Sequence, residues 1–268
     1  MSKQRPIGIF DSGLGGLTVA NAVYRKLSKE QLIYFGDSAH LPYGDKSAAT
    51  IQAYSVKICD VLLQKGCKLI LIACNSASAA AFELVKAYVG SKAKVLNVID
   101  PVVNYVADKY TGKHVGLIGT KQTVGSGVYE YQLKLKDPTI RFSALATPLL
   151  VPMIEEGFHN NNISEAIIEQ YLSDPILQGI DTLILGCTHY PLIKDEINNY
   201  YQGKIEVIDS SVIVAEALEK YLEEEGLSAE NLAADHEFLV SDITPSFEKA
   251  AELFFGRKVP LQKHILWE

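Results

Sequence analysis

Two of the four cysteines stand where a β-strand is expected to end and a helix to begin. Cys74 follows the apolar run Leu69–Ala73, and Cys187 follows the run Thr182–Gly186. The N-terminus of a helix carries partial positive charge, which favours the thiolate form of a cysteine placed there. Two such thiols on opposite walls of a cleft could act as base and acid on the two faces of one substrate carbon, which is the chemistry that inverts a stereocentre.

The other two cysteines are interpreted as buried packing residues. Cys59 lies inside an expected helix, and Cys67 precedes a strand without a polar turn. No Cys-x-x-Cys pair occurs, so a structural zinc site has little support, and no lysine stands in a setting that suggests a Schiff base. We therefore expect free thiols that work with neither a metal ion nor a cofactor.

Polar residues close to the two cysteines are further candidates for chemistry. His189 could lower the pKa of the Cys187 thiol or relay its proton, or it could simply cap a helix. Asp11, in the glycine-rich turn Phe10–Gly16, could hold a substrate ammonium, position a proton on a thiol, or cap a helix. The turn is not a dinucleotide-binding motif, because Thr18 stands at the last glycine position, and it lacks the Gly-Lys-Ser/Thr of a P-loop.

Two other segments have weaker signals. The loop Asp37–Gly44 follows an expected strand and contains Tyr43, which suits a functional loop and an ordinary turn equally. Glu155 and Glu156 precede a glycine in a helix-like stretch, and taken alone both are interpreted as solvated surface.

A framework of short strands and longer helices must position these residues. Apolar, β-branched runs alternate with helix-like stretches along the whole chain, a pattern that indicates an α/β fold with parallel sheets covered on both faces. The expected strands are Ile7–Phe10, Leu32–Phe35, Leu69–Ala73, Val95–Val98, Val115–Gly119, Ile140–Ala144, Thr182–Gly186, Glu206–Ile208 and Glu237–Ser241. The expected helices are Leu14–Leu27, Ala48–Lys65, Ala77–Val89, Val102–Tyr110, Thr123–Leu135, Ser164–Tyr171, Leu192–Tyr200, Val212–Glu225 and Pro245–Phe254.

A weak internal repeat indicates two lobes of similar build. The pattern of residues 7–13 returns at 115–120, and the pattern of residues 69–75 returns at 182–188. Each half therefore contains a strand that ends at a cysteine, on the edge where open α/β sheets bind ligands. Two lobes that face each other would bring both thiols into a single cleft.

Composition excludes several classes of function. The net charge is -7 and no cluster of lysine and arginine stands out, so the electrostatic source of nucleic-acid binding is missing. No uncharged apolar segment is long enough to span a bilayer, and the polar N-terminus lacks the apolar core of a signal peptide. We expect a cytoplasmic protein without membrane or nucleic-acid partners.

Four motifs occur in order over essentially the whole chain. They are Phe10-Asp11-Ser12-Gly13-Leu14-Gly15-Gly16, Pro42-Tyr43-Gly44, Ala73-Cys74-Asn75-Ser76-Ala77 and Gly186-Cys187-Thr188-His189-Tyr190-Pro191. Together they are similar to the signatures of bacterial glutamate racemases, within the aspartate/glutamate racemase superfamily. The resemblance implies two Rossmann-like lobes with mainly parallel sheets and the active site in the cleft between them. Residues 1–99 plus 205–268 would form the first lobe and 100–204 the second, inserted lobe.

The resemblance also implies an activity and a role for each residue. The protein would interconvert L-glutamate and D-glutamate without a cofactor and supply D-glutamate for peptidoglycan, as a homodimer. Cys74 would be the base acting on D-glutamate and Cys187 the base acting on L-glutamate. Asp11 and His189 would assist these thiols, with Glu155 as a further helper whose alignment against Glu156 is open. Substrate contacts would come from Asp11, Ser12, Tyr43, Gly44, Asn75, Ser76 (where the family more often has Thr), Thr188 and His189.

Three other functions stay open at this point. The chain could racemise aspartate or another acidic amino acid, since the sequence does not show the depth of the side-chain pocket. It could be a thiol hydrolase that uses Cys187 with His189 and does not need Cys74. A binding protein of the periplasmic-receptor type is disfavoured by the missing signal peptide.

Overall fold

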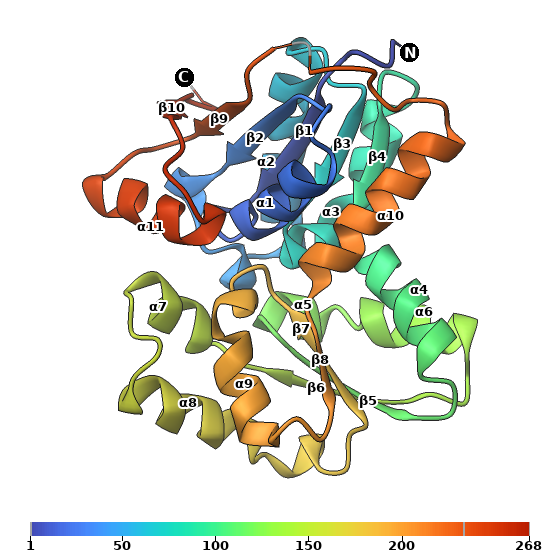
Figure 1. Cartoon of the computed structure of the whole chain (residues 1–268), viewed down its shortest axis with the longest axis vertical. Coiled ribbons are helices and arrows are strands. Elements are labelled where there is room, and N and C mark those ends of the chain that lie inside the picture. The colour runs from blue at the N-terminus through green and yellow to red at the C-terminus, as the bar shows by residue number, and fades with distance from the viewer. Residues whose placement is uncertain (1, 233, 268) are drawn as a thin grey trace.

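The short β-branched runs form the strands of two separate parallel sheets, drawn one above the other in Figure 1. The structure is a computed structural model that describes residues 2–232 and 234–267. The first sheet has the strand order β10-β9-β2-β1-β3-β4 and the second β6-β5-β7-β8, and all described pairings are parallel. The strands are β1 (Ile7–Asp11), β2 (Leu32–Gly36), β3 (Leu69–Ile72), β4 (Lys94–Asn97), β5 (His114–Gly119), β6 (Arg141–Ala146), β7 (Thr182–Gly186), β8 (Glu206–Ile208), β9 (Glu237–Val240) and β10 (Leu261–Lys263).

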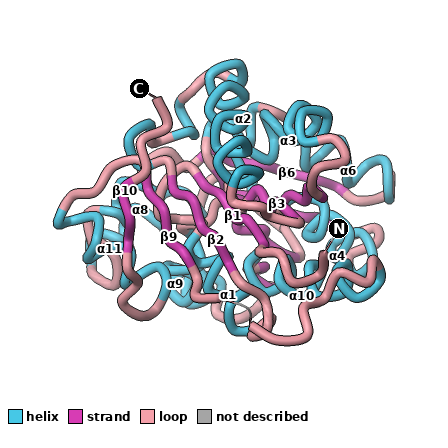
Figure 2. Tube along the Cα trace, turned by 90° about the horizontal axis from the view of Figure 1, so that it is seen from above, coloured by secondary structure: helices cyan, strands magenta, loops and turns pink. Residues whose placement is uncertain are grey.

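Helices cover both faces of the first sheet, which explains why every residue of β1, β2 and β3 is buried. Figure 2 shows α2 and α3 on one face and α1, α10 and α11 on the other. We call this sheet with its five helices the first lobe. The helices are α1 (Leu17–Lys26), α2 (Ala48–Gln64), α3 (Asn75–Val89), α10 (Ser210–Glu224) and α11 (Pro245–Phe255).

The second sheet and its helices form the second lobe. One hydrophobic cluster runs through both lobes, from Ile7 and Ile9 in β1 to Leu183 and Leu185 in β7, so the two sheets share a continuous core. Within the described residues, no helix is long and apolar enough to cross a membrane. The helices of this lobe are α4 (Ile99–Lys109), α5 (Lys121–Gly125), α6 (Val128–Lys136), α7 (Leu150–Glu155), α8 (Asn162–Leu172) and α9 (Lys194–Tyr201).

The predicted fold class, α/β with two mainly parallel sheets, is confirmed, with three differences in detail. Residues 206–208 were assigned to the first lobe, but they pair with β7 in the second sheet, so the chain returns to the first lobe at Asp209. The single helix expected over 123–135 is two helices, because Gly127 adopts a left-handed conformation at φ 66° between them. Strand β10 was not predicted, since its three residues are too few to show a period.

Candidate active site

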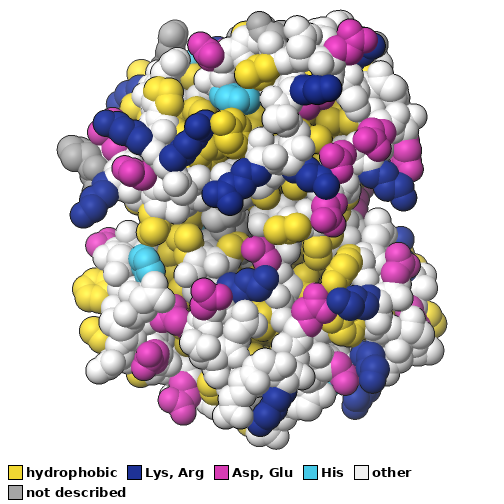
Figure 3. Space-filling view, in the orientation of Figure 1, with side chains coloured by type: hydrophobic (Ala, Val, Ile, Leu, Met, Phe, Trp, Pro, Cys, Tyr) yellow, Lys and Arg dark blue, Asp and Glu magenta, His cyan; other side chains and the backbone are white. Residues whose placement is uncertain are grey.

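The carboxyl ends of strands from both sheets face a cavity of about 220 Å³. In the space-filling view, a waist separates the two lobes and hydrophobic side chains show along it (Figure 3). The cavity is lined by Ser12, Gly13, Leu41, Pro42, Tyr43, Gly44, Asp45, Cys74, Asn75, Ser76, Thr120, Lys121, Thr147, Pro148, Val151, Pro152, Glu155, Cys187, Thr188 and His189.

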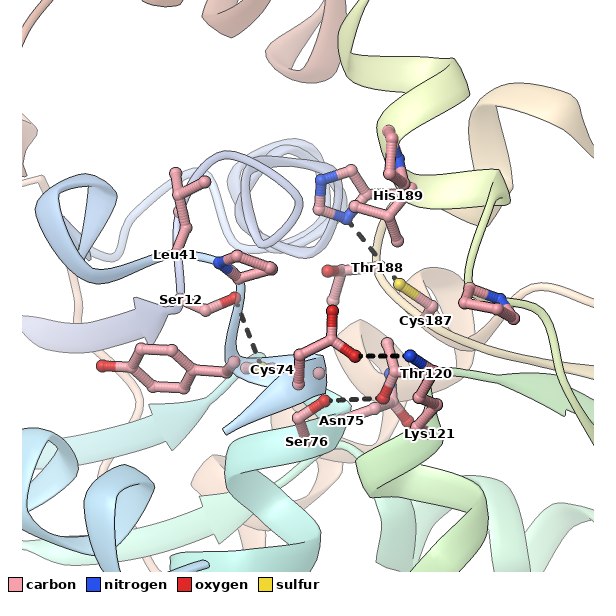
Figure 4. A pocket seen from close by; sticks show the side chains of 18 of the residues that line it. Ser12, Leu41, Cys74, Asn75, Ser76, Thr120, Lys121, Cys187, Thr188 and His189 are labelled. Carbon is pink, nitrogen blue, oxygen red and sulfur yellow. Dashed lines mark hydrogen bonds and ion pairs between the residues drawn. The ribbon is translucent and has the colours of Figure 1, made fainter. Parts of the chain in front are cut away.

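The structure brings almost all of the predicted site residues to this one cavity. Figure 4 shows Cys74 and Cys187 on opposite sides of it, with Thr188 between them. Cys59 and Cys67 are fully buried elsewhere in the core of the first lobe, which agrees with their interpretation as packing residues. The arrangement gives a bound molecule one thiol on each side.

Cys74 is the N-cap of α3. Its sulfur accepts a hydrogen bond from the backbone N–H of Ala77 at 3.4 Å, and its thiol donates to Ser12 Oγ at 3.6 Å. The helix N-terminus was expected to favour the thiolate form of Cys74, but the sum of all effects on its pKa has the opposite sign. Burial, and after it the negative charge of Asp11, raise the pKa of Cys74 to about 12, and the Ala77 and Ser12 hydrogen bonds offset this only in part. Cys74 is therefore protonated at neutral pH.

Cys187 has a cationic neighbour instead. His189 Nδ1 lies 3.7 Å from the Cys187 sulfur, and His189 Nε2 lies 2.8 Å from Glu155 Oε1. Burial lowers the pKa of His189, but the interactions with Cys187 and Glu155 outweigh it and raise this pKa to about 10. A protonated imidazole therefore lies beside the Cys187 sulfur at neutral pH.

The structure distinguishes the two glutamates that the sequence left open. Glu155 ends α7, lines the cavity and pairs with His189, whereas its neighbour Glu156 is exposed. Helical geometry explains the difference, because adjacent residues of a helix point in directions about 100° apart. We therefore take Glu155 as the carboxylate of the site.

Replacing Glu155 with glutamine should lower the pKa of His189. The carboxylate is one of the groups that raise this pKa, so the ring should lose its proton at a pH below about 10. An NMR titration of the imidazole, assigned by its loss in His189→Asn, measures the midpoint. Glu156→Gln is the matched control and should leave the midpoint unchanged. A Glu155→Gln midpoint equal to that of the original protein would contradict the pairing.

Asp11 lies behind the cavity wall and is not among the lining residues, although a direct substrate contact was expected. The side chain is fully buried at the end of β1. Its carboxylate accepts hydrogen bonds from the backbone N–H of Gly13 at 3.0 Å and from Thr188 Oγ1 at 3.5 Å. Burial raises the pKa of Asp11, against the lowering effect of His189 and of three backbone N–H groups. Asp11 thus contacts the lining residue Thr188 from behind the wall.

Sequence reasoning missed the residues that the second lobe adds to the wall. The Thr120 hydroxyl lies 2.9 Å from Ser76 Oγ, and Lys121 pairs with Asp45 at 3.1 Å between the lobes (Figure 4). The internal repeat contained the signal for Thr120, because this residue follows β5 as Ser12 follows β1. Thr147, after β6, had no comparable motif.

Tyr43 and Gly44 reach the cavity from a short 3₁₀ turn of the first lobe. The Tyr43 hydroxyl donates to Asp37 Oδ2 at 2.6 Å, and the buried Asp37 also accepts from Ser241 Oγ at 2.7 Å. A Cβ added at Gly44 would lie 2.8 Å from the Cβ of Thr120, so the two lobes are in close contact here. In the ranges that the structure describes, no three His, Cys, Asp or Glu side chains form a group that could hold a metal ion.

Comparisons with known proteins find relatives that are similar in sequence and in fold over nearly the whole chain. A family model described as Asp/Glu/hydantoin racemase matches residues 16–218. The chain is 39% identical over 258 residues to a glutamate racemase of Neisseria meningitidis, an alignment that covers 96% of this chain and 95% of that protein. The crystal structure of glutamate racemase from Francisella tularensis in complex with D-glutamate superposes with a TM-score of 0.91 at 37% identity, covering 98% of both chains. A glutamate racemase isoform from Bacillus anthracis gives a TM-score of 0.92 at 32% identity, again covering 98% of both chains.

Proposed function

The chain belongs to the Asp/Glu/hydantoin racemase family, and we propose that it interconverts L-glutamate and D-glutamate by moving the α-proton between Cys74 and Cys187. The observation that carries the proposal is the placement of one thiol on each side of a single cavity. The two thiols also have different surroundings, since the imidazole of His189 lies beside Cys187 and burial raises the pKa of Cys74.

In the direction from L-glutamate, the Cys187 thiolate takes the α-proton, so a C–H bond breaks and an S–H bond forms. The Cys74 thiol, whose pKa of about 12 keeps it protonated, then gives its proton to the opposite face of the carbon. The forward step leaves Cys74 as a thiolate and Cys187 protonated. From this state the reverse direction runs with the roles exchanged, so Cys74 takes the α-proton of D-glutamate and Cys187 gives its proton to the opposite face. The α-proton of an amino acid is far less acidic than a thiol, so exclusion of water and electrostatic stabilisation must lower the barrier.

The other residues of the site would hold the substrate and tune the thiols. Ser12, Asn75 and Thr188 present hydroxyl and amide groups on the cavity wall, suited to the two carboxylates of glutamate. His189, held by Glu155, would stabilise the Cys187 thiolate. Tyr43, Gly44 and Ser76 complete the predicted contacts, and Asp11 supports Thr188 from behind.

The first experiment is incubation of the purified protein with L-glutamate in deuterated water, without added cofactor and with a chelator. Circular dichroism follows optical activity and NMR follows the α-proton. Loss of both signals together is the expected result. Faster turnover of L-aspartate in the same assay would assign the enzyme to the aspartate branch, and persistence of both signals in folded protein would overturn the proposal.

The cellular role is proposed from the same resemblance. We propose that the enzyme works in the cytoplasm as a homodimer and supplies D-glutamate for peptidoglycan. The support is the similarity to bacterial proteins named glutamate racemase. Complementation of a bacterial strain that requires D-glutamate tests the role, and light scattering of the purified protein tests the dimer.

A further inference from the structure

The two polar atoms of the Asn75 side chain, on the cavity wall, differ in their hydrogen bonding. Its carboxamide oxygen accepts a 2.8 Å hydrogen bond from the Tyr129 hydroxyl. Its nitrogen, Nδ2, has no hydrogen-bond partner within the described part of the chain, although Asn75 is only 2% exposed. A buried donor without a partner is unfavourable, and Asn75 lines the cavity. These observations indicate that the nitrogen donates its hydrogen bond to a molecule bound in the cavity.

The Tyr129 hydroxyl determines which end of the amide faces the cavity. Burial raises the pKa of Tyr129, so the group keeps its proton and can donate it. Asn75 Oδ1 is the acceptor that the structure gives to this hydroxyl. If the amide turned over, the tyrosine proton would lose that acceptor and the oxygen would face the cavity, where it could not donate to an anionic group.

Tyr129 is itself held firmly, and it comes from the opposite lobe. It lies in α6 of the second lobe and is 1% exposed, in a core cluster with Val102 and Leu133. Asn75 begins α3 of the first lobe. The bond therefore sets the amide orientation from across the boundary between the lobes, and the tyrosine itself is absent from the cavity lining.

We propose that Tyr129 is a positioning residue that fixes the Asn75 amide with its nitrogen towards the cavity, where it donates to a carboxylate oxygen of the bound amino acid. This inference rests on the proposed function, since the ligand is the substrate of that reaction. It adds a residue from the second lobe to the determinants of substrate affinity.

Tyr129→Phe removes the hydroxyl and keeps the buried ring. We expect KM for L-glutamate and for D-glutamate to rise about three- to tenfold, with kcat changed less than about twofold, because an oriented hydrogen bond to the bound substrate is weakened. Calorimetry with racemic glutamate, whose composition racemisation does not alter, should show the same loss of affinity. Tyr131→Phe is the matched control on the same helix, since this side chain is 66% exposed, and its kinetics should stay unchanged.

A double-mutant cycle separates positioning from general packing. In an Asn75→Ala background, Tyr129→Phe should leave KM and the calorimetric affinity unchanged, because no amide remains to be oriented. If the two substitutions instead raised KM independently, so that their factors multiplied in the double mutant, the proposal would be overturned. An unchanged KM in Tyr129→Phe alone would also overturn it. If Tyr129→Phe lowers the unfolding temperature too far to assay, Asn75→Asp keeps the acceptor for Tyr129 and loses the donor, so an unchanged affinity there would also overturn it. Failure of the unsubstituted protein to racemise or bind glutamate would instead refute the proposed function.

Discussion

Replacing either Cys74 or Cys187 with serine is expected to lower kcat for glutamate racemisation by about a thousandfold, within the range that a lost general acid or base costs. Serine has nearly the same shape as cysteine, but its hydroxyl is a far weaker acid and its alkoxide is not accessible near neutral pH. Each substitution leaves one thiol in place, so the two variants should differ in which enantiomer they still deprotonate. In deuterated water, Cys187→Ser should impair exchange of the α-proton of L-glutamate more than Cys74→Ser does.

The exchange experiment also decides between the proposal and its alternatives. D-glutamate should show the opposite order, with Cys74→Ser the more impaired variant. Cys59→Ala is the control. Cys59 is buried in α2 and does not line the cavity, so its replacement should leave kcat unchanged. Full activity of Cys74→Ala would contradict the two-thiol reaction and favour a hydrolase built on Cys187 and His189. A reversed order of exchange would mean that the two faces are assigned the wrong way round.

Gly15→Ala should reduce kcat/KM for glutamate by about a hundredfold, the loss that displacement of a positioned group by about 1 Å can cause. A Cβ at this position would lie 2.3 Å from Thr188 Oγ1 and 2.4 Å from His189 Nδ1. Carbon cannot approach these atoms so closely, so the Thr188 and His189 side chains must move. The Nδ1 atom is the one that faces Cys187, so the thiolate would lose its cationic neighbour.

The matched control for this substitution is Gly125→Ala. A Cβ there would meet nothing within 4 Å, and Gly125 ends the short helix α5, so kinetics and unfolding temperature should stay close to the original. The midpoint of the NMR titration of the His189 imidazole should fall in Gly15→Ala. It should stay unchanged in Gly125→Ala, because only the substitution at Gly15 displaces the ring. Gly15→Ala with normal kinetics would show that the site tolerates a shift of His189.

Local patterns in the sequence were sufficient for the architecture and for the positions of both thiols. Strand ends at Gly186 and close to Cys74 follow from apolar β-branched runs stopped by small polar residues, and the structure confirms them. The alternation of strands and helices likewise predicted parallel sheets, because each period depends on residues only a few positions apart, and the internal repeat indicated two lobes. The resemblance to glutamate racemases added Ser12, Tyr43 and Thr188 as candidate contacts, and all three line the cavity.

Only the tertiary structure decided the environment of each group. It separated Glu155 from Glu156, placed Asp11 behind the wall, and set the pKa of Cys74 above its ordinary value by burial. It also brought Tyr129 to Asn75 across 54 positions of sequence and across the lobe boundary. Desolvation and hydrogen bonding depend on which distant segments enclose a side chain. A pattern of a few neighbouring residues does not show which segments these are.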